Sequence, residues 1–368
     1  MLFHFLFFAF ASSITSSIIK LTTTVSAYQY DKFHPTLYYP NEGVDYAIYL
    51  NTFLSHTILG CTFRILNSSK RNSSFHQDDY YCHLYDTSIR FKDIVLSNIS
   101  VYYANDSAWS RDMGIALGYH SDNESFSIVN LLYKRNKIEK NQFAFNTKEK
   151  EGNWLIGGIP NEEHMYSKYK GVIKVNESLP TWGFKLKEIL YKNEKHEMNL
   201  DTIVHSGMHN LIISDDVFEI MLHKVFKPDL IAKQCHTETT EDYGVNFDMA
   251  YMSCSQLSHN EQIKFVFENV IITLNESDLF DIFKTSRFRG NGKPNLFANF
   301  SGVLLGKEFI ELFDYIIFDY TNKQVELYSN STMITLTERE KHQLSVKMFF
   351  GVNIILCLFN IVILLYKQ

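Results

Sequence analysis

Proline and cysteine are scarce, with 6 and 5 residues among 368. Five cysteines are too few for a small fold held together by disulfides. The net charge of −6 leaves no basic excess, which argues against a nucleic-acid-binding protein. Few prolines together with 22 Tyr and 30 Phe favour β-strands. A composition of 45% hydrophobic and 21% charged residues excludes wholesale disorder and collagen-like repeats.

Several motifs of common enzymes and metal sites are also missing. The sequence has no Gly-rich phosphate loop, no CxxC knuckle and no Gly-x-Ser-x-Gly elbow. His205 and His209 lie close in sequence, but no HExxH or comparable ligand set surrounds them. The sequence therefore implies no metal, nucleotide or haem cofactor.

Short apolar runs bounded by Asn, Asp, Ser and Gly recur along the chain. Runs at 46–50, 153–156 and 315–318 have the length and composition of strands. Apolar residues instead recur at three and four positions over 126–133, and again after a capping Ser214 through 225, which predicts two helices. Many short strands with a few short helices predict a mainly β fold.

The N-terminus resembles a secretory signal. Residues 2–10 form an apolar block too short to span a bilayer, and a Ser/Thr-rich stretch follows. Val25-Ser26-Ala27 fits the small-x-small cleavage rule, although no Lys or Arg precedes the apolar block. We therefore expect a signal peptide over residues 1–27; a buried N-terminal strand or helix is the alternative.

The C-terminus predicts a membrane anchor. Residues 348–366 are 19 residues without a formal charge, bounded by Lys347 and Lys367. At about 1.5 Å per residue this run nearly matches a hydrocarbon core of about 30 Å. We expect a polar stalk over 330–346, a transmembrane helix over 347–366 and a type I single-pass topology, with a glycolipid-anchor signal as the alternative.

Glycosylation sequons support lumenal exposure along the secretory pathway, at the cell surface or in endomembranes. Nine Asn-x-Ser/Thr sites occur, at Asn67, Asn72, Asn98, Asn105, Asn123, Asn176, Asn275, Asn299 and Asn330.

Disulfides are permitted in that compartment. Cys235 and Cys254 lie 19 residues apart in one polar stretch, and Cys61 and Cys82 lie 21 apart. We predict both pairs as bridges, the first more strongly, with free buried thiols as the alternative. Cys357 falls in the predicted membrane helix and is expected to be unpaired.

An ordered set of motifs covers roughly residues 38–329. Its members are Gly114-Ile115-Ala116-Leu117-Gly118-Tyr119, the segments 127–132 and 141–145, Leu155-Ile156-Gly157-Gly158-Ile159, Trp182-Gly183-Phe184, the segment 303–310, Ile317-Phe318-Asp319-Tyr320 and the segment 322–327. In order and spacing this set resembles the pepsin-like aspartic peptidases.

The resemblance implies a mainly β, bilobal fold with a long central cleft that takes an extended peptide or protein. The N-terminal lobe would span 28–160 and the C-terminal lobe 161–329. In that family each lobe supplies one Asp, from a turn with two hydrophobic residues, the Asp, Thr or Ser, and Gly. The two carboxylates share a proton because like charges so close cannot both ionise.

Both Asp positions are substituted in this chain. The second turn reads Ile203-Val204-His205-Ser206-Gly207, so His205 takes the place of the Asp. The first turn is matched best by residues 49–55, with Asn51 in place of the Asp and Phe53 in place of the Gly.

The family's flap tyrosine and turn residues would bind substrate. Counting on from Asn51, the flap spacing lands on Tyr81, which leaves Cys82, His83 and Leu84 at the tip. By resemblance, Tyr81, Ser206 and Gly207 are then the substrate-binding positions.

These substitutions predict a catalytically inactive, monomeric homologue that binds peptide or protein. Asn has no titratable carboxyl group, and His205 would lack an acidic partner. Asp201 and Asp45 offer no displaced substitute, and we expect both to be solvated strand-end carboxylates. A working endopeptidase with an unorthodox dyad around His205 is the alternative, and an unrelated β-rich ectodomain is a third reading.

Overall fold

A computed structural model describes residues 18–22, 36–39, 44–47, 50–52, 58–59, 69–77, 80–91, 94–104, 115–119, 127–146, 153–159, 168–179, 181–206, 212–213, 215–232, 235–241, 248–254, 262–275, 288–289, 302–331 and 333–337. All structural statements below concern these residues. Strands dominate them, as the composition predicts.

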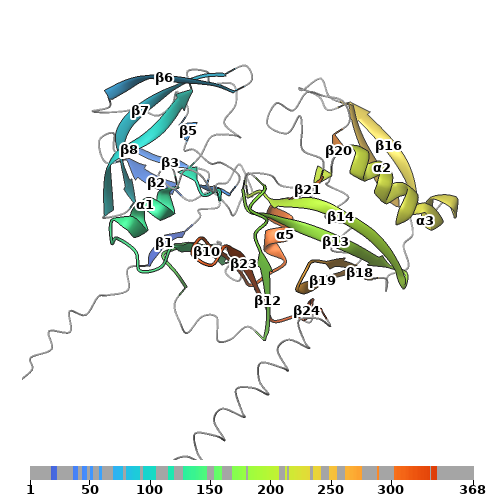
Figure 1. The fold of residues 1–368 in the computed structure, drawn as a ribbon. Coiled ribbons are helices and arrows are strands. Elements are labelled where there is room, and N and C mark those ends of the chain that lie inside the picture. Colours follow the sequence, from blue (N-terminus) through green and yellow to red (C-terminus); the bar gives the residue numbers. More distant parts are fainter. Residues whose placement is uncertain are drawn as a thin grey trace, which may run out of the picture.

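The N-terminal half is built on a four-stranded sheet (Figure 1, upper left). Its order is β5 (Ile58–Leu59), β8 (Ile94–Ala104), β7 (Tyr80–Phe91) and β6 (Ser69–Gln77). Two short pairs accompany it: antiparallel β2 (Thr36–Tyr39) with β3 (Val44–Ala47), and parallel β4 (Leu50–Asn51) with β9 (Ile115–Ala116). Helix α1 (Ile128–Lys134) follows.

The C-terminal half carries a seven-stranded sheet (Figure 1, right). Its order is β15 (Ile212–Ile213), β21 (Gly302–Leu305), β14 (Glu194–Val204), β13 (Gly183–Tyr191), β18 (Gln262–Val266), β19 (Val270–Asn275) and β24 (Ile334–Leu336). A smaller sheet joins β16 (Cys235–Glu241), β17 (Asp248–Cys254) and β20 (Phe288–Arg289). The helices are α2 (Asp215–Lys224), α3 (Lys227–Ile231) and α5 (Lys307–Glu311).

A six-stranded sheet joins the two halves below (Figure 1). Its order is β1 (Ile19–Thr22), β11 (Asn153–Ile156), β10 (Gln142–Asn146), β22 (Tyr315–Asp319), β23 (Gln324–Ser329) and β12 (Tyr169–Lys174). Strands β10 and β22 pair antiparallel, with Phe143 opposite Phe318, so the halves share one continuous sheet.

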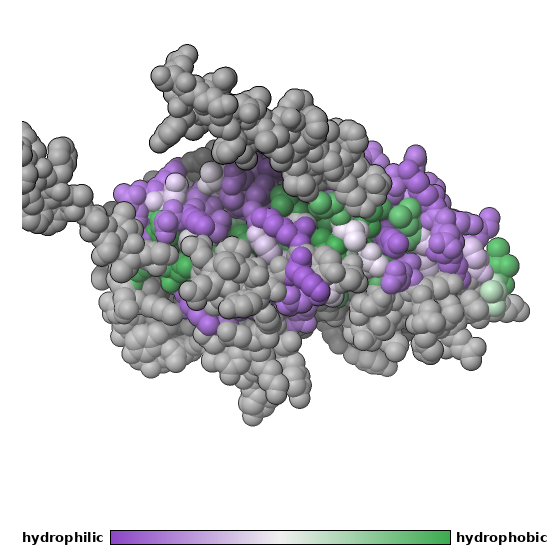
Figure 2. Space-filling view, turned by 90° about the horizontal axis from the view of Figure 1, so that it is seen from below, coloured by the Kyte–Doolittle hydropathy of each residue, from purple (hydrophilic) through white to green (hydrophobic). Residues whose placement is uncertain are grey.

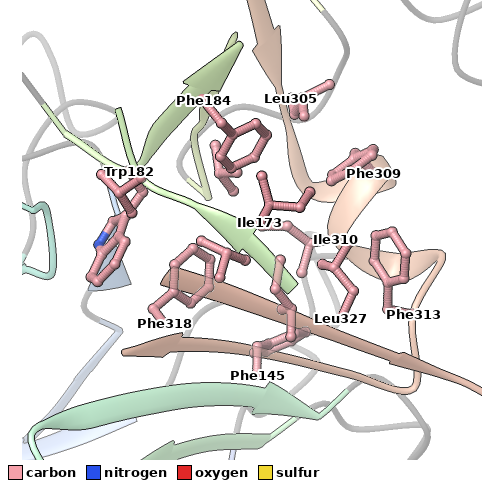
Figure 3. Packing of buried hydrophobic residues seen from close by; sticks show 14 of the residues in the cluster. Phe145, Ile173, Trp182, Phe184, Leu305, Phe309, Ile310, Phe313, Phe318 and Leu327 are labelled. Carbon is pink, nitrogen blue, oxygen red and sulfur yellow. The ribbon is translucent and has the colours of Figure 1, made fainter. Parts of the chain in front are cut away.

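Aromatic side chains fill the junction above this sheet. The rings of Phe143 and Phe318 stack with centroids 4.6 Å apart, and Trp182 meets Phe318 edge-on at 5.2 Å. Figure 3 shows Trp182 and Phe318 converging with Phe145 and Ile173 in the same cluster. Burying such side chains stabilises the fold by roughly 1.5–3 kcal/mol each.

The local sequence signals account for most of these elements. Strand β11 matches the predicted run at 153–156, and β22 matches 315–318. The predicted strand at 46–50 is divided between β3 and β4. Both predicted helices are confirmed as α1 and α2, and the Ser127 hydroxyl caps α1 by accepting a hydrogen bond from the Asn130 N–H.

Two predicted segments contain strands of the structure. The predicted stalk begins at 330, but β24 pairs with β19 and Ile334 is buried, so the C-terminal half continues to Thr337. The predicted signal peptide ends at 27, but β1 pairs with β11 inside the shared sheet. For residues 19–22 the structure thus matches the alternative, a buried N-terminal strand.

None of the described helices is long and apolar enough to cross a membrane. The predicted transmembrane helix at 347–366 lies outside the described residues.

A polar network lies across β12 and β23 of the shared sheet. Lys170 Nζ lies 2.7 Å from Glu326 Oε2, and the Tyr328 hydroxyl donates to the same oxygen at 2.7 Å. Burial alone would raise the pKa of Glu326, but the hydrogen bonds from Lys170 and Tyr328 outweigh this effect, so the pKa of Glu326 lies below its ordinary value.

Seen from below, the described surface mixes hydrophilic and hydrophobic patches (Figure 2).

Candidate functional site

Two short segments, 154 residues apart in sequence, meet at the junction of the two halves. The N–H of Thr52 donates to Ser206 Oγ at 3.0 Å, and the N–H of Ser206 donates to Thr52 Oγ1 at 3.0 Å. Each hydroxyl therefore accepts a hydrogen bond from the other residue's backbone.

The same two hydroxyls also donate across the junction. Thr52 Oγ1 donates to the Val204 carbonyl at 2.9 Å, and Ser206 Oγ donates to the Leu50 carbonyl at 2.7 Å. Each accepting carbonyl lies two residues before the other hydroxyl, so the four bonds form a reciprocal, pseudo-two-fold set. Thr52 and Ser206 are fully buried, which strengthens these bonds relative to bonds in water.

The strands that lead into the two segments are arranged alike. Strand β4 runs parallel to β9, with Leu50 opposite Ile115, and β14 runs parallel to β21, with Val204 opposite Leu305. The His205 N–H continues the second ladder by donating to the Leu305 carbonyl at 2.9 Å. Each segment is thus held at the end of a parallel strand pair.

A third segment, which contains Thr181 and Trp182, makes further hydrogen bonds to the junction. The Thr181 hydroxyl donates to the Thr52 carbonyl at 2.7 Å, and the Val204 N–H donates to the Trp182 carbonyl at 3.0 Å. The Trp182 indole N–H and the Tyr320 hydroxyl both donate to the Leu117 carbonyl, each at 2.7 Å. Burial raises the pKa of Tyr320, which keeps this hydroxyl protonated as a donor.

The network brings two of the predicted site positions together. Asn51 directly precedes Thr52, and His205 directly precedes Ser206, so the four hydrogen bonds fix their backbones as neighbours. His205 is 3% exposed. An amide and an imidazole therefore occupy the two positions, and neither residue carries a carboxyl group.

The two nearby aspartates take no part in this arrangement. Asp201 Oδ1 lies 2.6 Å from Lys185 Nζ, in an ion pair that joins β14 to β13. Four residues of extended chain place it about 13 Å along the strand from His205. Asp45 pairs opposite Tyr38 in the separate β2–β3 ribbon.

The residues predicted at the flap tip lie within a strand. Cys82, His83 and Leu84 lie within β7, paired with Ala104, Tyr103 and Tyr102 of β8. The turn of the β6–β7 hairpin instead falls between Gln77 and Tyr80, with Tyr81 opposite His76 just beyond it. Counting from Asn51 missed the turn because spacing along a chain does not register changes in loop length.

Several predicted residues lie partly or wholly outside the described set. Gly207 and Cys61 are among them, as are most of the sequons. Within the described set, Asn330 is exposed after β23, and its side-chain oxygen accepts a hydrogen bond from the Lys168 N–H at 3.3 Å.

Cys235 and Cys254, the pair predicted more strongly as a disulfide, are directly opposite each other in the β16–β17 register.

Two residues of the junction were not predicted as site residues. Thr52 belongs to the weaker of the two turn motifs. The motif expects Gly after the Thr or Ser, but Phe53 follows Thr52, so the sequence did not show that Thr52 corresponds to Ser206. Thr181 carries no sequence signal at all. The described residues contain no group of three His, Cys, Asp or Glu side chains that could hold a metal ion.

Comparisons with known proteins identify the family and the fold. The model of the family described as eukaryotic aspartyl protease matches residues 78–329. The crystal structure of an aspartic proteinase from Irpex lacteus superposes with a TM-score of 0.60 at 15% sequence identity, covering 86% of this chain and 98% of that one. A comparison with curated proteins gives no match.

Proposed function

Because the chain belongs to the eukaryotic aspartyl protease family, we propose that it is a catalytically inactive, membrane-anchored member that binds an extended peptide or protein. The observation that carries the proposal is the reciprocal hydrogen bonding of Thr52 and Ser206. It supports the assignment of Asn51 and His205 to the family's two Asp positions, since Asn51 directly precedes Thr52 and His205 directly precedes Ser206.

The chemistry of these two side chains supports inactivity. In the family, one carboxylate activates water and the other polarises the scissile carbonyl. Asn51 cannot accept the proton of a water molecule, because its amide does not titrate in the accessible pH range. His205 can accept one, but the amide of Asn51 is not an acid and cannot protonate the scissile carbonyl. General acid–base groups contribute about 10²–10⁴-fold each, so their loss leaves little activity.

Peptide binding is the function that a retained cleft can still perform. An extended peptide adds its backbone hydrogen bonds to a strand edge and places alternate side chains in pockets. Neither contribution needs a carboxylate. Phe53, where the family has a turn glycine, and Tyr81 beside the β6–β7 turn are proposed contact residues.

The sequons and the C-terminal apolar run support the proposed location at a membrane of the secretory pathway. The nine sequons and the apolar run at 348–366 suit a glycosylated, type I membrane protein. Since the fold continues to Thr337, the segment 338–346 would be the whole link to the membrane. These nine residues, fully extended, reach about 30 Å, so the domain would lie close to the bilayer surface.

The first experiment tests catalysis. The full chain, purified in detergent from a secretory host, is incubated at pH 3–7 with a mixed peptide library, with and without a statin-type transition-state mimic. We expect no cleavage by the folded protein at any pH. Cleavage that the mimic blocks and that a His205→Ala variant loses would refute inactivity and make His205 catalytic.

The second experiment tests binding. Peptides selected for binding to the full chain would be resynthesised with a photoreactive group and crosslinked to it. We expect crosslinks to tryptic fragments that contain Asn51 or His205. A selection without binders, or crosslinks confined to other fragments, would contradict the proposed binding role.

A further inference from the structure

Strand β1 is an integral part of the fold. Four residue pairs, from Ile19 opposite Ile156 to Thr22 opposite Asn153, align β1 with β11 at the edge of the shared sheet. Ile19 is 5% exposed and belongs to the main core cluster. Ile18 packs against a second cluster on the sheet, which includes Leu155.

Cleavage after Ala27 would remove this strand. The β11 edge would then present unpaired N–H and C=O groups next to the buried side chains of Trp154 and Leu155. Such an edge invites pairing with other chains. A signal peptide is removed during synthesis, so a strand inside it could not belong to the mature fold.

We propose that the leader is cut before Ile18, within the Ser/Thr-rich segment 11–17, so that β1 is retained. This inference rests on the proposed targeting to the secretory pathway. Residues 2–10 supply an apolar block of nine residues, within the 7–15 typical of signal peptides. Thr15-Ser16-Ser17 then fits the small-x-small rule.

The reaction is an ordinary hydrolysis by the host's signal endopeptidase. Water adds to the Ser17 carbonyl, the Ser17–Ile18 amide bond breaks, and Ser17 leaves as a carboxylate while Ile18 becomes the new α-amine. The resulting leader of 17 residues has an ordinary length.

The test is the N-terminus of the full chain expressed in a eukaryotic secretory host. Chemical labelling of α-amines followed by mass spectrometry should identify a first residue between Ser12 and Ile18. A chain beginning at Tyr28, or one that keeps Met1, overturns the proposal. Glycan occupancy separates the causes: a glycosylated chain with Met1 refutes only the cleavage, whereas an unglycosylated one also refutes the proposed targeting.

Two matched variants sharpen the result. Ala27→Arg should leave the N-terminus unchanged, because the proposed cut lies upstream; loss of processing in this variant overturns the proposal. A foreign signal peptide joined directly to Ile18 should support several-fold more secretion than the same signal joined to Tyr28. Equal secretion and equal thermal stability of the two products would show that β1 is dispensable.

Discussion

Replacing Thr52 by Val tests whether the reciprocal hydrogen bonds hold the two halves together. The change preserves shape but removes one hydroxyl, which accepts from the Ser206 N–H and donates to the Val204 carbonyl. Leaving a buried polar group without its partner costs about 1–3 kcal/mol. With two groups affected, we expect the free energy of unfolding to fall by about 2–6 kcal/mol.

Thr202 provides a matched control in the same region. It is also fully buried, but its hydroxyl makes no hydrogen bond among the residues that the structure describes. Burying an unpaired hydroxyl costs free energy, so Thr202→Val should be neutral or should stabilise by up to about 1 kcal/mol. The two substitutions remove the same atom and differ only in its hydrogen bonds.

Urea unfolding of the full chain, followed by tryptophan fluorescence, measures both variants, since Trp154 and Trp182 are buried. A Thr52→Val loss below about 0.5 kcal/mol, or equal losses for both variants, would refute the role of the network. A Thr52→Val/Ser206→Ala double variant should lose less than the sum of the single variants, because both pairs of bonds join the same two segments and loss of one pair already loosens the other.

Three further outcomes are expected. Non-reducing peptide mapping should recover Cys235 linked to Cys254, since directly opposed strand positions suit disulfide geometry; separate, alkylatable cysteines would contradict this pairing. Because the pKa of Glu326 is lowered in the fold, its contribution is present above its ordinary pKa of about 4.5 and is lost as the pH falls through the folded value. Wild type should therefore exceed Glu326→Gln in stability by at most about 1 kcal/mol at pH 7, and this excess should shrink as the pH falls below 4.5. Urea titrations that give a pH-independent difference would contradict this expectation. Gly171→Ala should cost about 1–3 kcal/mol, because an added Cβ would lie 2.9 Å from side chains of β19 and β24; an unchanged melting midpoint would argue against that packing.

The sequence predicted those parts of the fold that local patterns determine. Alternating and continuous apolar runs indicated β11 and β22, and helical spacing indicated α1 and α2. The Ser206-Gly207 motif located the second turn. The partnership of Thr52 with Ser206 could not be predicted locally, since it joins positions 154 residues apart.

The structure departs from the predicted segments where a local pattern was interpreted without its distant partner. Val25-Ser26-Ala27 satisfies a cleavage rule, but only the pairing with β11 reveals β1. Polar neighbours made residues 330–346 look like a stalk, whereas Ile334 is buried against β19. The flap tip was placed by counting, which assumes loop lengths that the β6–β7 hairpin does not have.

The junction explains how a chain with Asn51 and His205 beside the two hydroxyls can keep the fold. Its four hydrogen bonds use two hydroxyls and four backbone groups, and none uses the side chain of Asn51 or His205. Two carboxylates at these neighbouring positions would repel each other and raise the pKa of one of them. An amide and an imidazole do not repel each other in this way, so Asn51 and His205 do not weaken the hydrogen bonds that hold the halves together. A fold match is therefore compatible with inactivity, and function must be argued from the side chains at positions 51 and 205.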